Sequence, residues 1–251
     1  MKLAVISDIH GNYVAFAAVL ADLERAAPAR VVCLGDAIQG GPQPAEVARG
    51  LRALACPVVM GNADDYLLKG TASDAEAVTP ERQARMDAVR AWSLAQLSEA
   101  DKAFIASFTP TITDPLDGTR ALLGFHGSPE SFDHVLLPTT PEDEFQARLG
   151  PYAPSLMCGG HTHLQQVRRL GGTFFFNPGS VGFAYNAQQD EAGFQADPWA
   201  EYALLTVEDG RLGLEFRRVP FDAAELRRVY RESGRPFGEE AAGQYGGRES
   251  V

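Results

Sequence analysis

The chain has 251 residues, of which 45% are hydrophobic and 22% charged, as in an ordinary soluble globular domain. Its net charge of -11 argues against a general nucleic-acid-binding protein, because phosphate contacts need clustered Lys and Arg. Short apolar runs and an N-terminus without a signal-like segment lead us to expect a cytoplasmic protein that does not bind membranes.

The N-terminal part alternates strands and helices. Residues 2–7 (KLAVIS) and 30–35 (RVVCLG) are apolar runs rich in β-branched residues, which is typical of buried strands. Between them, the apolar residues of 16–23 fall on one face of a helix. This pattern predicts a βαβ unit with parallel strands. A second helix, beginning near Pro44, leads to a third strand over 57–61.

The next segment, 66–108, is predicted to be a helical insert, since Thr79-Pro80 and Ser98 mark the starts of helices. After the insert we expect strands over 120–127, 155–161, 173–177, 201–207 and 212–219.

The C-terminal part is predicted to end the domain with one helix. Asp222 and Glu225 form a capping box at its start, and Gly234 marks its end. We therefore expect a single domain over residues 1–237. Residues 238–251 are rich in Gly and charge, which indicates a mobile tail.

Side chains that bind metals follow five predicted strands, at the edge where α/β sheets bind ligands. They are Asp8 and His10 after the first strand, Asp36 after the second, Asn62 after the third, His126 after the fourth, and His161 and His163 after the fifth. Such nitrogen and oxygen ligands suit Mn, Fe, Zn, Co or Ni. Seven ligands are too many for one ion, so we expect two divalent ions that share Asp36.

Six motifs, in this order, carry a family resemblance. DIHGN (8–12), GDAIQGGP (35–42), GNAD (61–64), GFHGSP (124–129) and GGHTH (159–163) resemble the five blocks of the calcineurin-like metallophosphoesterases. NPGSVG (177–182) is similar to the next block in the small bacterial and archaeal phosphodiesterase branch. The resemblance spans about residues 3–182. It implies an α/β fold, namely an αββα sandwich of two mixed sheets flanked by helices.

The resemblance also implies how the ligands are shared. One ion would take Asp8, His10, Asp36 and His163, and the other Asp36, Asn62, His126 and His161. A bridging water would attack phosphorus, and Mn²⁺ is the first expectation for the ions. Asp36, Asn62 and His126 are thus the expected catalytic residues. Asn62 is also expected to contact the substrate phosphate, and Asn12 either to contact substrate or to form a turn.

Ala63 stands where many family members carry the histidine that is taken to protonate the leaving group. General acid catalysis contributes about 10²–10⁴ in rate, so its loss slows hydrolysis without abolishing it. We expect a binuclear phosphodiesterase acting on small phosphodiesters or nucleotides, without stable nucleic-acid binding. The alternatives are a catalytically silent scaffold on this fold and a nucleotide-binding sensor. His134, the one histidine outside the motifs, could replace the acid or be a surface residue.

Overall fold

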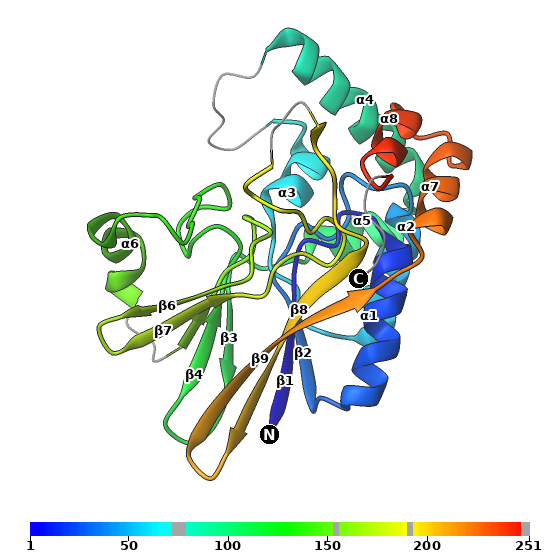
Figure 1. The fold of residues 1–251 in the computed structure, drawn as a ribbon. Coiled ribbons are helices and arrows are strands. Elements are labelled where there is room, and N and C mark those ends of the chain that lie inside the picture. Colours follow the sequence, from blue (N-terminus) through cyan, green and yellow to red (C-terminus); the bar gives the residue numbers. More distant parts are fainter. Residues whose placement is uncertain (72–78, 153–155, 190–192, 247–251) are drawn as a thin grey trace.

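The computed structural model describes residues 1–71, 79–152, 156–189 and 193–246, which form two β-sheets packed face to face between helices (Figure 1). The first sheet contains, in spatial order, β2 (Arg30–Cys33), β1 (Lys2–Ile6), β8 (Trp199–Glu208) and β9 (Arg211–Pro220). The second contains β3 (Ile112–Pro115), β4 (Ala121–Gly124), β5 (Leu156–Cys158), β7 (Thr173–Asn177) and β6 (Gln166–Leu170). Each sheet mixes parallel and antiparallel pairs, so the predicted αββα sandwich is confirmed.

An apolar layer between the sheets joins them. Leu3 and Val5 of β1 face Phe176 of β7 in this layer, and all three side chains are fully buried. Because side chains alternate along a strand, Ala4 and Ile6 of β1 point the other way, toward the helices. β1 and β2 are parallel, as the βαβ pattern predicts.

Helices cover the outer face of each sheet. Those on the first sheet are α1 (Tyr13–Ala26) and α2 (Pro44–Leu54), and the one on the second is α6 (Glu142–Leu149), which continues into a 3₁₀ turn over Gly150–Tyr152. Phe16 and Leu51 bury their side chains completely beneath α1 and α2. Phe145 of α6 packs edge-on against Phe175, with 5.2 Å between the ring centroids. Both sheets are therefore covered on the side away from the shared core.

The insert consists of three helices, α3 (Asn62–Lys69), α4 (Pro80–Gln96) and α5 (Glu99–Ala106). It begins at Asn62 and not at 66, because Gly61 is the N-cap residue of α3. Thr79 caps α4, and Ser98 with Asp101 forms a capping box on α5, as predicted. No helix in the described part of the chain is both long and apolar enough to cross a membrane.

The edges of the sheets differ from the sequence prediction. Residues 57–61 form only isolated bridges, Val58 with Cys33 and Val59 with Thr109, because the chain turns into α3 at once. β3 and β6 were not predicted. They are the edge strands of the second sheet; their buried residues include the polar Asp114 and Gln166, whereas Val167 is exposed, so no apolar periodicity marks them.

The prediction of a mobile tail over 238–251 is wrong for residues 238–246. α7 (Ala223–Glu232) is followed by α8 (Gly238–Gly243), and the two helices pack together. Ala242 is fully buried, and Tyr245 is 3% exposed and stacks on Tyr230. Small residues allow this close packing although their composition indicates mobility. Residues 247–251 lie outside the described part of the chain.

Candidate metal centre

The seven predicted ligands converge at the carboxyl ends of strands from both sheets. Asp8, His10 and His163 form one group, and Asp36, His126 and His161 form another; within each group the donor atoms lie within 4.8 Å of one another. Asn62 joins the second group, with its Oδ1 3.0 Å from His126 Nε2. Asp36 Oδ2 lies 3.3 Å from His126 Nε2 and 3.7 Å from His10 Nε2. Asp36, a member of the second group, therefore also lies near His10 of the first.

Three of the histidines are fixed in orientation by backbone carbonyls. His10 Nδ1 lies 3.0 Å from Gln39 O, His126 Nδ1 2.7 Å from Leu34 O, and His163 Nδ1 2.8 Å from Phe183 O. A carbonyl can only accept, so each neutral ring carries its proton on Nδ1. The lone pair on Nε2 then faces the centre, which is the arrangement that ligating histidines need.

The two carboxylate oxygens of Asp8 differ in their hydrogen bonds. Its Oδ2 accepts hydrogen bonds from Ser7 Oγ at 2.5 Å and from the backbone N–H of His161 at 3.1 Å. Its Oδ1 is buried and has no hydrogen-bond partner among the described residues. Burying a carboxylate oxygen without a partner is unfavourable. A cation beside Oδ1 would satisfy it, so the residues present fit a metal ion.

Asp36 is positioned by the insert. Its Oδ1 accepts a hydrogen bond from the backbone N–H of Ala63 at 2.8 Å, which leaves Oδ2 facing the histidines. Asp64, fully buried, accepts from the backbone N–H groups of Ala37 and Ile38, each at 2.9 Å. Asp64 therefore orders the loop that follows Asp36, and the side chain of Ala63 offers no proton.

Five of the seven ligands have a left-handed backbone. The φ angles are 55° at Asp8, 48° at His10, 48° at Asp36, 68° at His161 and 58° at His163. Non-glycine residues rarely adopt this region, which costs about 1–3 kcal/mol for each residue held there. The surrounding fold maintains these turns, which aim the ligand side chains at a common point.

The pKa values of the ligands shift in opposite directions. Burial disfavours charge on His126, yet the carboxylates of Asp36 and Asp8 raise its pKa to about 10. Burial and the neighbouring charge of His126 lower the pKa of His161 to about 4. The two buried carboxylates thus require positive charge beside them, which a bound cation would supply in place of the proton on His126.

A cavity of about 320 Å³ opens above the ligands. Phe183 forms part of its wall, stacked on Phe194 and packed edge-on against His163, so these rings hold residues 183 and 194 beside the centre. Another part of the wall comes from the C-terminal segment, including Arg235 before α8 and Tyr245 after it; the Tyr245 ring lies 6.3 Å from that of Phe183. Sequence reasoning missed Tyr245 because it assigned residues 238–251 to a mobile tail, and it did not single out Arg235.

Two predicted residues have other contacts. Asn12 is 1% exposed; its Oδ1 caps α1 by accepting from Ala15 N, and its Nδ2 donates to Gly182 O. These hydrogen bonds fit the turn-forming role, and Asn12 is not among the residues that line the cavity. His134 lies 2.8 Å through Nδ1 from Ser128 Oγ and does not line the cavity.

Comparisons with known proteins agree with this geometry. The sequence model of the calcineurin-like phosphoesterase superfamily domain matches residues 1–210. An uncharacterized protein of Methanocaldococcus jannaschii is 28% identical over 237 residues, which cover 88% of each chain.

Two solved structures have the same fold along nearly the whole chain. A metallophosphoesterase from Sphaerobacter thermophilus has a TM-score of 0.69 at 26% identity, covering 97% of this chain and 100% of that one. A hypothetical protein from Pyrococcus horikoshii has a TM-score of 0.79 at 21% identity, covering 99% of each. With the motifs, the ligand geometry and the matched family model together, this chain belongs to the calcineurin-like phosphoesterase superfamily.

Proposed function

We propose that the protein is a phosphodiesterase that uses two divalent metal ions to hydrolyse small phosphodiesters or nucleotides. The observation that carries the proposal is the pair of adjacent ligand groups, with Asp36 of the second group 3.7 Å from His10 of the first; in the proposal Asp36 binds both ions. Bound ions would lower the pKa of a water and neutralise charge on the phosphoryl group. A catalytically silent scaffold has no physical need for two complete groups of ligands.

The side chains around the centre support distinct roles. Asp8, His10, Asp36, Asn62, His126, His161 and His163 would hold the ions. The amide of Asn62 opens α3 and lines the cavity, where its Nδ2 can donate to a phosphate oxygen. Arg235 is the one cationic Lys or Arg side chain lining this cavity among the described residues, and it can bind an anionic substrate.

The lack of an acid at Ala63 favours diesters with good leaving groups. A monoester carries more negative charge and usually a poor alkoxide leaving group, so it depends more on protonation. Aryl esters and phosphoanhydrides need little protonation. We therefore expect faster hydrolysis of an aryl phosphodiester than of the matching monoester.

The test is the initial rate of bis(p-nitrophenyl) phosphate hydrolysis with Mn²⁺, beside p-nitrophenyl phosphate. Asp36→Asn should reduce the diester rate by about 10²-fold or more, since it removes the shared charge. Asp209→Asn is a matched control, because Asp209 also has a left-handed backbone, with φ of 49°, but lies exposed in the β8–β9 turn.

Three results would count against the proposal. A strong preference for the monoester would sink the diesterase assignment. Absence of hydrolysis in the wild type, with Mn²⁺ shown to be bound, would favour the scaffold. Tight binding of an unchanged nucleotide under the same conditions would favour the sensor.

A further inference from the structure

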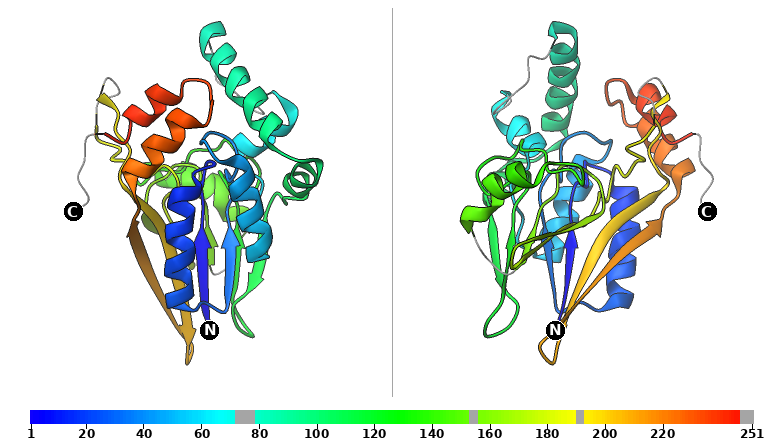
Figure 2. Two further views of the ribbon diagram at one scale, coloured as in Figure 1. Left: turned by 90° about the vertical axis from the view of Figure 1, so that its right-hand side faces the viewer. Right: turned by 60° about the vertical axis from the view of Figure 1, so that its left-hand side comes forward.

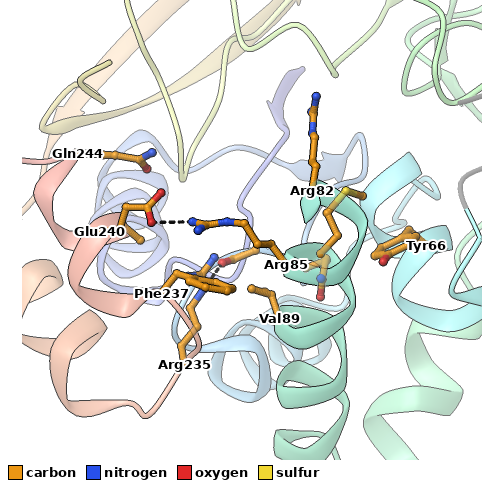
Figure 3. Close-up of a pocket in the computed structure, with 12 residues that line it drawn as sticks. Tyr66, Arg82, Arg85, Val89, Arg235, Phe237, Glu240 and Gln244 are labelled. Carbon is orange, nitrogen blue, oxygen red and sulfur yellow. Dashed lines mark hydrogen bonds and ion pairs between the residues drawn. The ribbon is translucent and has the colours of Figure 1, made fainter. Parts of the chain in front are cut away.

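A second cavity, of about 460 Å³, lies between α4 of the insert and the C-terminal helices. Figure 2 shows α4 on one side and α7 with α8 on the other, above the same end of the sheets. Three arginines line this cavity, which we call the arginine pocket: Arg82 and Arg85 from α4, and Arg235 from the segment between α7 and α8 (Figure 3).

The arginine pocket adjoins the metal cavity. Gly40, Arg235, Ala241 and Gln244 line both cavities, so the two are neighbours with these four residues in common. Gln39 also connects them, since its carbonyl lies 3.0 Å from His10 Nδ1 while the residue lines the arginine pocket. An elongated ligand that passes these shared residues would reach the metal ligands and the arginines together.

The charge of the arginine pocket opposes that of the whole chain. Three arginines and one glutamate line it, a balance of 3 - 1 = +2, in a protein of net charge -11. Within the described residues, neither Arg82 nor Arg235 has a carboxylate at ion-pair distance. Arg235 donates through Nε to Gly40 O at 2.6 Å and through Nη1 to Pro236 O at 2.8 Å. These bonds hold the guanidinium in place and leave Nη2 for a ligand.

Glu240 is the one internal competitor for a bound anion. Arg85 donates to Glu240 at 2.6 Å across the pocket and stacks on the ring of Phe237, 3.9 Å from its centroid (Figure 3). Phe237 is the N-cap residue of α8 and has a left-handed backbone with φ of 60°, which is rare for a bulky residue. The Arg85–Glu240 pair is exposed, so little free energy is needed to open it.

We propose that the arginine pocket binds a second anionic group of the substrate, so that the preferred substrates are phosphodiesters that also carry a terminal phosphate. The inference rests on the proposed function for the reaction at the metal centre. A terminal phosphate is a dianion with three acceptor oxygens, which matches several guanidinium groups better than a carboxylate does.

The experiment compares two dinucleotides that differ only in the terminal group, dithymidine monophosphate (TpT) and its 5′-phosphorylated form (pTpT). For the Mn²⁺ enzyme we expect a KM for pTpT at least about tenfold lower, the size of one charge-assisted contact. In the double variant Arg82→Gln, Arg85→Gln the ratio of the two KM values should approach one. Arg228→Gln is the matched control, because Arg228 is an exposed arginine of α7 that lines neither cavity, and it should keep the wild-type ratio.

The variant Glu240→Gln tests whether Glu240 competes with a bound anion for Arg85. It removes the carboxylate that holds Arg85, so the preference for pTpT should increase. A purely structural role of the Arg85–Glu240 pair would instead lower stability in both variants without changing the KM ratio.

Calorimetric titration of both dinucleotides into the wild-type protein in EDTA separates this inference from the proposed function. Tighter binding of pTpT without any hydrolysis in Mn²⁺ would support the pocket and contradict the phosphodiesterase. Hydrolysis of both at equal KM, with equal affinity in EDTA, would overturn the pocket and leave the phosphodiesterase standing. A preference for pTpT that survives in the double variant would also overturn it.

Discussion

At the residue scale, the metal centre depends on turns that most side chains avoid. Asp8 and His10 lie in a left-handed turn after β1, and His161 and His163 lie in another after β5. Glycines beside these turns leave room for the ligands. A Cβ at Gly160 would overlap Ser7 Oγ and lie 2.9 Å from Asp8 Oδ2. The lack of a Cβ at Gly160 thus leaves room for the hydrogen bond from Ser7 Oγ that orients Asp8.

We predict that Gly160→Ala displaces Asp8 and weakens metal binding by about 10–100-fold, the usual effect of disturbing the groups that orient a ligand. Titration with Mn²⁺ followed by calorimetry measures the change. Gly118→Ala is the control, because a Cβ there would meet nothing within 4 Å. Equal Mn²⁺ affinity in the Gly160 variant and the wild type would show that Asp8 does not depend on this space.

At the element scale, one carboxylate of α1 makes hydrogen bonds to two strands of the first sheet. Asp22 accepts hydrogen bonds from Tyr202 of β8 at 2.5 Å and from Arg217 of β9 at 2.9 Å. Burial would raise the pKa of Asp22, but these hydrogen bonds lower it below its usual value of 3.8. The charged form is therefore the one that stabilises the fold.

We predict that Asp22→Ala lowers the free energy of unfolding by about 1–3 kcal/mol at neutral pH, because it leaves the buried Tyr202 hydroxyl without an acceptor. A carboxyl with a lowered folded-state pKa stabilises the protein above its unfolded pKa and loses that effect as the pH falls through the folded value. Urea unfolding of both proteins should thus give a difference that shrinks below about pH 4. A difference that grows toward acid pH would contradict the assignment.

The C-terminal helix allows a second prediction at this scale. Removal of residues 238–251 takes away Ala242 and Tyr245, which are buried against α7 and the loop at Gly182. Loss of one buried aromatic side chain costs about 3–5 kcal/mol, and about 2–4 °C accompany each kcal/mol in a chain of this size. We therefore expect the Tm to fall by roughly 6 °C or more. An unchanged Tm would instead support the prediction of a mobile tail over residues 238–251.

Elements with strong periodicity could be predicted from the sequence, and those at edges could not. β7 has its predicted bounds because Thr173–Asn177 is a buried central strand, whereas β3 and β6 form edges with polar residues. The candidate ligands could be located because each follows an apolar run that predicts a strand, which is local information, although the run before Asn62 forms only isolated bridges. The wall from Arg235 to Tyr245 could not, since its position depends on packing between segments about 60 residues apart or more, such as Tyr245 and Gly182.

At the scale of the whole molecule, metal binding should stabilise the fold. Ions that bind only the folded state add about 2.7 kcal/mol at 100 times their Kd, which corresponds to roughly 5–10 °C in Tm here. We predict a rise of this size on adding Mn²⁺ to protein treated with a chelator, and a much smaller rise in Asp36→Asn. Wild-type protein with no metal-dependent change in Tm would favour the scaffold.

Because the candidate ligands come from both sheets, we expect metal binding to follow folding. Asp8, His10 and Asp36 follow strands of the first sheet, whereas His126 and His161 follow strands of the second. Neither ligand group is complete until the two sheets have packed together through their shared apolar layer. The first group also contains residues as far apart as 8 and 163, so the chain must be synthesised past residue 163 before this group can form. Under the proposed function, metal binding would therefore follow folding, and a bound ion would indicate that both sheets are in place.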